Sequence, residues 1–216
     1  MNAQTTELDR TAAAPAAADT AKRRQIIEGA QRVFLAQGFD AASMGEIARA
    51  AGVSKGTLYV YFENKEELFQ AIVGQVCQVQ AEQIFSFDHD DHDVEAVLTR
   101  LGNAYATFVV TRPGGLSPLR TVIAIADRMP EMGRRFYETG PARGITNLAA
   151  YLKAQVDAGV LAVEDCEVTA AQFMDACLAT LFKPALFNFC ATPSAERIAH
   201  VVGIAVRAFM AAYGKR

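Results

Sequence analysis

The side chains with the clearest chemical potential in this 216-residue chain lie in one short segment, KGTLYVY at residues 55–61. If the segment is a helix with Leu58 and Phe62 facing inward, a rotation of about 100° per residue turns the other side chains outward or sideways. This outer face is small and nearly uncharged: Lys55, Gly56, Thr57, Tyr59, Val60 and Tyr61. Hydroxyl, phenol, ammonium and small apolar groups suit phosphate oxygens, base edges and thymine methyl groups, whereas an ordinary solvated face carries several charges. The face therefore indicates contact with DNA.

The elements that must present this face are two short helices joined by a tight turn. Residues 44–51 carry apolar side chains at helical spacing, and Ser43 with Glu46 forms a capping box at the start of this helix. Gly52 ends it, because a residue without Cβ turns there at least cost, and Ser54 caps the second helix. Together they predict a helix-turn-helix unit, whose second helix commonly enters the DNA major groove. The alternative is a helix-turn-helix used only for packing.

Residues 22–72 resemble the N-terminal domain of the tetracycline-repressor (TetR) family. The matching pieces occur in the family's order and spacing: GF at 38–39, IARAAGVS at 47–54, KGTLYVYF at 55–62 and NKEELF at 64–69. The resemblance implies that the following residues lie at DNA-contacting positions: Ser43, Ser54, Lys55, Gly56, Thr57, Tyr59, Tyr61 and Lys65. Val60 departs from the larger aromatic or polar residue of some members, which leaves the base preference open.

Charge is distributed unevenly along the chain. The net charge of −3 argues weakly against nucleic acid, but residues 20–70 hold seven basic and six acidic side chains, so this end is less acidic than the rest. Arg23 and Arg24 follow Lys22 in a basic triplet, and we predict that they contact the DNA backbone; a solvated helix start explains the triplet equally well. Lys65 stands just beyond the second helix, where we expect it to reach a phosphate.

The chain divides into three predicted parts. Residues 1–19 are Ala-rich with one proline and no aliphatic periodicity, which predicts a flexible arm. Residues 20–65 hold the helix-turn-helix domain. Residues 66–216 continue as helix after helix without a useful alternating strand pattern. The predicted fold class is all-α: an N-terminal three-helix helix-turn-helix domain plus a larger helical domain for ligand sensing and dimerisation.

Two late stretches, residues 168–189 and 194–213, are apolar around most of their circumference. Helices of this kind are buried on two sides, so we predict a homodimer seam through residues 168–213; a well-buried monomer core is the alternative. The family resemblance favours the seam, because its members usually dimerise through their last two helices. A dimer also supplies a second recognition helix about one DNA turn, roughly 34 Å, away.

The segment RMPEMGRRFYETGPARG at residues 128–144 is similar to the C-terminal domains of the AefR-like branch of the family. This similarity implies a repressor with a small-molecule pocket among the central helices. Aromatic and Met side chains on facing helices suit an adaptable apolar cavity, although plain core packing is the alternative for each. The candidate pocket residues are Tyr105, Phe108, Ile123, Phe136, Leu148, Tyr151, Met174 and Cys177. We expect a small apolar or amphipathic effector to release the dimer from a palindromic double-stranded DNA operator.

Other functions have weaker support. The four cysteines show no C-x-x-C spacing, which excludes the usual zinc frameworks and indicates reduced thiols in the cytoplasm. A redox-responsive regulator stays an alternative, as does a metal-responsive one using His89 and His92 of DHDDHD, although a solvated loop explains residues 88–93 without a metal. The chain lacks G-x-S-x-G, H-E-x-x-H and a Gly-rich phosphate loop, so we predict no enzyme and no cofactor. It has neither a secretory signal nor an apolar run of membrane-spanning length.

Overall fold

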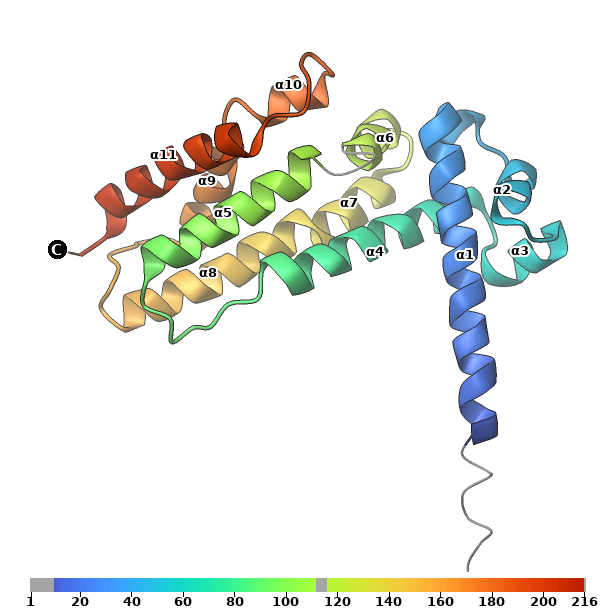
Figure 1. Ribbon diagram of the computed structural model, residues 1–216, viewed down its shortest axis with the longest axis horizontal. Coiled ribbons are helices and arrows are strands. Elements are labelled where there is room, and N and C mark those ends of the chain that lie inside the picture. Colours follow the sequence, from blue (N-terminus) through green and yellow to red (C-terminus); the bar gives the residue numbers. More distant parts are fainter. Residues whose placement is uncertain (1–9, 112–115, 216) are drawn as a thin grey trace, which may run out of the picture. The chain divides into compact units, whose positions relative to one another are not determined.

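The computed structural model describes residues 10–111 and 116–215, with residues 10–18 and 76–83 described by their backbone alone (Figure 1). Within these ranges the chain is a series of helices, and the sole β-type pairing is an isolated bridge between Leu161 and Gly214. The predicted all-α fold is confirmed. The helices form two compact units, Met1–Val73 and Gly74–Arg216. The division falls inside helix α4 (Lys65–Ile84) rather than at its start, where the sequence had suggested the domain boundary.

The first unit contains α1 (Arg10–Ala41), α2 (Met44–Ala51), α3 (Lys55–Tyr61) and the beginning of α4. Its interior is filled by fully buried aliphatic and aromatic side chains, among them Ile26, Ile47, Leu58, Phe62 and Leu68. The helical backbone of α1 is interrupted at Gly38, whose φ of 80° lies in the left-handed region. This interruption lets the chain turn from α1 towards α2.

The start of α1 differs from the predicted arm. Helix α1 begins at Arg10, so it includes residues 10–19, and residues 1–9 lie outside the described part of the chain. Alanine has the highest helix propensity of all residues. The absence of aliphatic periodicity is evidence that this segment is not buried. It is not evidence against a helix, because an exposed segment can also be helical.

A close approach of two backbones fixes α2 against α1. A Cβ atom built on Gly29 of α1 would lie 2.6 Å from the Cβ and 2.7 Å from the Cα of Ala51 in α2. Real Cβ atoms do not approach other carbons so closely, so any side chain at residue 29 would push the helices apart. The small size of both residues therefore sets the distance between the first two helices of the first unit.

The second unit is built from α5 (Val94–Thr111), α6 (Ser117–Ile125), α7 (Pro130–Thr139), α8 (Pro141–Asp157), α9 (Cys166–Cys177), α10 (Phe182–Leu186) and α11 (Ala195–Tyr213). One buried cluster joins α5, α8, α9 and α11, and α5 lies beside α11 (Figure 1). No helix of the described residues is long and apolar enough to cross a membrane.

The long helix expected to end near residue 189 is broken. Helix α9 ends at Cys177, Thr180 has a positive φ of 62°, and a short α10 follows. Pro184 supplies the reason, because in a continuous helix its ring would clash with the carbonyl of the residue four positions earlier, which is Thr180. Because of this break, some apolar residues after α9 line a cavity that is described below, and others lie on the surface. Phe187 and Phe189 are 76% and 84% exposed.

Candidate nucleic-acid interface and effector pocket

Helices α2 and α3 are held by local caps. Ser43 and Glu46 form the predicted capping box, with the Ser43 N–H donating to Glu46 Oε2 at 3.0 Å and the Glu46 N–H donating to Ser43 Oγ at 3.3 Å. The hydrogen bond from the Ser43 side chain is the main cause that lowers the pKa of Glu46. Gly52 ends α2 with a φ of 65°, and Ser54 Oγ accepts the Thr57 N–H at 3.0 Å. These caps define the two helices and the turn between them.

The outer face of α3 lies where the helical rotation predicted it. Leu58 and Phe62 are buried, whereas Tyr59 is half-exposed and Val60 is 81% exposed. Lys55 and Gly56 are also exposed. The face has the size and chemistry of a surface that reads base edges, because its most exposed side chain is a small apolar one.

Three of the predicted contact residues at the edges of this face have protein partners. The Lys55 side chain crosses α2 beside Gly45, where a Cβ would lie 2.9 Å from Lys55 Cε. The Thr57 hydroxyl lies 2.8 Å from Ser54 Oγ. A hydrogen bond with the Asp19 carboxylate raises the pKa of Tyr61. Hydrogen bonds thus orient Thr57 and Tyr61, and the Lys55 side chain lies close to Gly45.

Side chains of α1 stabilise the end of α2, which the sequence did not reveal. Gln25 Nε2 donates to the carbonyl of Ala51, and Arg32 Nη2 donates to the carbonyl of Ala50, each at 2.6 Å. The last carbonyls of a helix have no partner within it, and a cation there also opposes the helix dipole. Spacing along the sequence carries no signal for contacts between residues this far apart.

The three residues of the basic triplet, Lys22, Arg23 and Arg24, have different surroundings in the structure. The Arg23 guanidinium lies 5.0 Å from the centroid of the Phe62 ring, which is a cation–π contact, and the Lys22 ammonium donates to Gln25 Oε1 at 3.0 Å. Arg24 is exposed on α1. Arg23 thus contacts Phe62 at the end of α3 and is exposed, as Arg24 is.

Lys65 is the residue whose position departs most from the sequence-based expectation. Its ammonium donates to the carbonyls of Phe39 at 2.9 Å, Asp40 at 3.0 Å and Ala42 at 3.3 Å, and it lies 4.7 Å from the centroid of the Phe39 ring. An ammonium has three N–H donors, so all three are directed at the backbone between α1 and α2. In this geometry Lys65 caps the end of α1, and its predicted phosphate contact stays a prediction.

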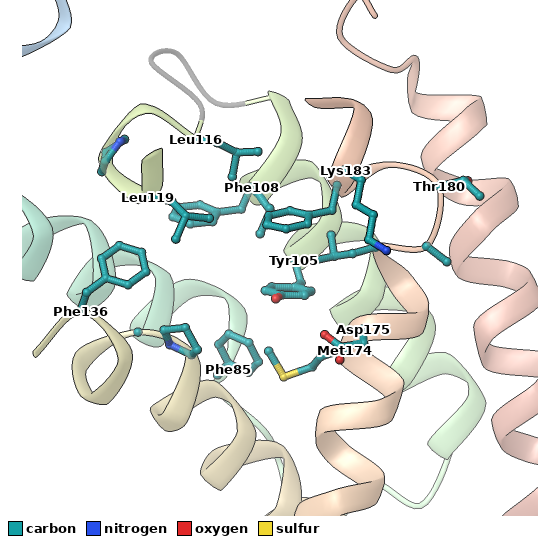
Figure 2. A pocket seen from close by; sticks show the side chains of 17 residues that line it. Phe85, Tyr105, Phe108, Leu116, Leu119, Phe136, Met174, Asp175, Thr180 and Lys183 are labelled. Atoms are coloured by element: carbon teal, nitrogen blue, oxygen red, sulfur yellow. The ribbon is translucent and has the colours of Figure 1, made fainter. Parts of the chain in front are cut away.

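The second unit encloses a cavity of about 790 Å³ between α5, α6, α7, α9 and α10 (Figure 2). Its walls are mainly aromatic and aliphatic, with a few polar groups. Four of the eight predicted pocket residues line it: Tyr105, Phe108, Phe136 and Met174. Residues that the sequence analysis missed complete the wall: Phe85, Val109, Leu116, Pro118, Leu119, Gly140, Pro141, Asp175, Leu178, Ala179, Thr180, Phe182 and Lys183.

The other four predicted pocket residues lie elsewhere. Ile123 is 57% exposed, because it lies on the side of α6 away from the buried Val122 and Ile125. Leu148, Tyr151 and Cys177 are fully buried in the core cluster and do not line the cavity. Helical periodicity identified their inward direction, but it does not tell which inward face meets a cavity.

The DHDDHD loop is attached to α8 instead of being free in solvent. Tyr151 Oη donates to the Asp91 carbonyl at 2.8 Å, and Gln155 Nε2 donates to the His89 carbonyl at 2.8 Å. Gln155 Oε1 therefore faces His92 Nδ1 at 2.7 Å, which requires the proton on Nδ1. No group of three or more metal-binding side chains occurs among the described residues. The loop is thus held against α8 by hydrogen bonds from Tyr151 and Gln155, while His89 and His92 remain exposed residues.

A capped helix-turn-helix with a nearly uncharged outer face, followed by a helical unit around an apolar cavity, is the arrangement of a DNA-binding transcription regulator. Two family descriptions match the chain: bacterial regulatory proteins of the tetR family over residues 26–72, and the C-terminal domain of AefR-like transcriptional repressors over residues 96–215. The chain belongs to the tetR family, with an AefR-like C-terminal domain. The homologues and the family are DNA-binding transcription regulators and not enzymes.

Individual relatives agree with this assignment. The repressor BepR of Brucella suis biovar 1 (strain 1330) is 36% identical over 90 residues, which are 39% of this chain and 43% of BepR. The chain thus spans less than half the length of this curated relative. A solved tetR-family regulator from Mesorhizobium loti MAFF303099 is 30% identical, with a TM-score of 0.82 over 91% of this chain and 98% of the other. The flavonoid-responsive regulator FrrA is 29% identical, with a TM-score of 0.77 over 91% and 99% of the two chains.

Proposed function

We propose that this protein is a ligand-responsive repressor, which acts in the cytoplasm and binds a palindromic operator as a homodimer. A small apolar or amphipathic molecule in the cavity releases it from DNA. The observation that carries the proposal is the presence in one chain of an exposed, nearly uncharged α3 face and an apolar cavity of about 790 Å³. The name of the related FrrA, a flavonoid-responsive regulator, supports a small-molecule effector.

The proposed DNA contacts lie on the outer face of α3 and around it. Val60, Tyr59 and Thr57 read base edges from the outer face of α3. Backbone phosphates are bound by residues around that face: Arg23, Arg24, Ser43, Ser54, Lys55, Gly56 and Tyr61. Lys65 is left out of this set, because its ammonium is already bound to three backbone carbonyls. Its role in operator binding is to position α2.

The proposed dimer uses the exposed apolar side chains within residues 168–213. These are Val168 on α9, Ile204 on α11, and Phe187 and Phe189 after α10. Val168→Glu combined with Ile204→Glu should yield a folded monomer, measured by light scattering and circular dichroism. The matched control is Ile123→Glu, an exposed isoleucine outside the seam, which should leave the dimer intact. A monomeric unmutated protein would contradict the proposal.

These two positions are better probes than the most apolar residues of the same helices. Val202 is fully buried inside its own protomer, and Leu178 lines the cavity. A charge at either position would disrupt the protomer itself. Only exposed positions separate dimerisation from folding.

The effector step is tested by titrating the protein–operator complex with candidate molecules while fluorescence anisotropy of the DNA is followed. A molecule that fills the cavity should weaken operator binding, and by linkage the operator should weaken binding of that molecule by the same factor. Filling the cavity by Met174→Trp should make operator binding insensitive to the molecule. A molecule that binds in the cavity without changing operator affinity would contradict effector release.

A further inference from the structure

The apolar wall of the cavity is interrupted by a phenol and a carboxylate. Tyr105 comes from α5 and Asp175 from α9, and both line the cavity. Figure 2 shows their oxygen atoms directed into the cavity, with Met174 and Phe85 nearby. The Tyr105 ring packs edge-on against Phe85, with 6.0 Å between the ring centroids. The Tyr105 ring is thus held against an aromatic neighbour, whereas Asp175 lines the cavity and is also exposed to solvent.

These groups have no partner within the described part of the protein. Among residues 10–111 and 116–215, no hydrogen bond joins the Tyr105 hydroxyl or the Asp175 carboxylate to another group, and neither is in an ion pair. Burial, and secondarily the negative charge of Asp175, raises the pKa of Tyr105, so the phenol keeps its proton at neutral pH. A molecule that displaces water from this part of the cavity must therefore replace the hydrogen bonds that the water made.

We infer that the effector is an aromatic molecule with a hydroxyl group that accepts a hydrogen bond from Tyr105 and donates one to Asp175. A hydroxyl carries one donor and two acceptor lone pairs, so a single group meets both requirements. The aromatic body packs against Phe85, Phe108 and Met174. This inference rests on the proposal that the cavity holds the effector.

Lys183 supports a competing kind of ligand. Its exposed side chain also lines the cavity, so an aromatic anion could bind there instead. Such an anion would approach the Asp175 carboxylate, and the two like charges would repel each other. An uncharged hydroxyl group avoids this repulsion and also accepts the hydrogen bond that Tyr105 donates.

The test compares three probes of nearly equal shape: 2-naphthol, 2-methoxynaphthalene and 2-naphthoate. Their dissociation constants for the full chain are measured at neutral pH by calorimetry. 2-Naphthol should bind at least about tenfold more tightly than 2-methoxynaphthalene, because only the naphthol donates to a charged acceptor. Asp175→Leu and Tyr105→Phe should each reduce this preference to under about threefold, with 2-methoxynaphthalene affinity nearly unchanged. Tyr137→Phe, at an exposed tyrosine that does not line the cavity, is the matched control.

Equal affinities for 2-naphthol and 2-methoxynaphthalene would overturn the inference. So would a preference that survives both substitutions, tighter binding of 2-naphthoate, or no binding of any probe. Operator affinity measured with the same probes separates the two proposals. Preference for the hydroxyl without loss of operator binding contradicts effector release alone, whereas operator release without such preference contradicts the hydroxyl site alone.

Discussion

Replacement of Lys65 by Met should weaken operator binding without changing its salt dependence. Met keeps the contact of an unbranched apolar chain with the Phe39 ring but removes the ammonium that donates to the carbonyls of Phe39, Asp40 and Ala42. The substitution therefore leaves the end of α1 uncapped just before α2 begins. A phosphate contact, by contrast, would be lost directly from the DNA interface.

The expected magnitude follows from the exposure of these bonds. A hydrogen bond to a charged group contributes about 1.5–3 kcal/mol to stability when it is buried. At a half-exposed ammonium the contribution is smaller, because water can replace the lost partner. The bonds to Phe39 and Ala42 are partly buried and the bond to Asp40 is exposed. We expect Lys65→Met to lower the free energy of unfolding of the first unit by about 2 kcal/mol.

The assay measures operator affinity at several salt concentrations for the unmutated protein, Lys65→Met and Lys55→Met. A lost phosphate contact reduces the slope of log affinity against log salt by about 0.9 per half-site. Lys55→Met should show this reduction, and Lys65→Met should keep the original slope with a lower affinity. If Lys65→Met reduced the slope as much as Lys55→Met, Lys65 would be a phosphate contact and the positioning role would be refuted.

Three further changes test other parts of the structure. Gly29→Ala should lower the free energy of unfolding by about 1–3 kcal/mol in urea, since its Cβ would clash with α2; Gly74→Ala, which has open space around it, should not, and equal effects would contradict the tight contact. Tyr59→Ala should cost about 1–3 kcal/mol at the operator and little on random DNA, and equal losses would make Tyr59 a phosphate contact. Burial raises the pKa of the Cys177 thiol to about 12, so little thiolate forms there at mildly alkaline pH. In thiol titration Cys177→Ser should therefore leave the number of fast-reacting thiols unchanged while Cys190→Ser lowers it by one; a loss of a fast thiol in Cys177→Ser would reveal a reactive site.

The helix-turn-helix could be predicted from sequence because its signals are local. The capping box at Ser43, the glycine turn at Gly52 and the inward pair Leu58 and Phe62 all lie within one short segment. The position of Lys65 could not be predicted, because its three acceptors are 23 to 26 residues earlier in the chain. Sequence spacing defines helix faces, and it does not define which loop a long flexible side chain reaches.

The cavity was only half predictable for a related reason. Aromatic and Met side chains on inward faces included Tyr105 and Met174, which line it, and Tyr151, which is buried in the core. The wall supplied by α10 depends on the break between α9 and α10. Pro184 was a visible signal for that break, because proline is incompatible with a helix interior. The polar residue Asp175 has no sequence signal that distinguishes it from an ordinary surface carboxylate.

Operator recognition through α3 is tested most directly by selecting bound duplexes from a random-sequence DNA library with the purified protein. A homodimer that presents two copies of α3 should enrich an inverted repeat, with half-sites separated by about one helical turn or a multiple of it. Replacing Val60, Tyr59 and Thr57 together by Ala should abolish the enrichment while circular dichroism shows the fold intact. Failure of the unmutated protein to enrich any sequence, or the same enriched sequence with the triple variant, would contradict recognition by this face.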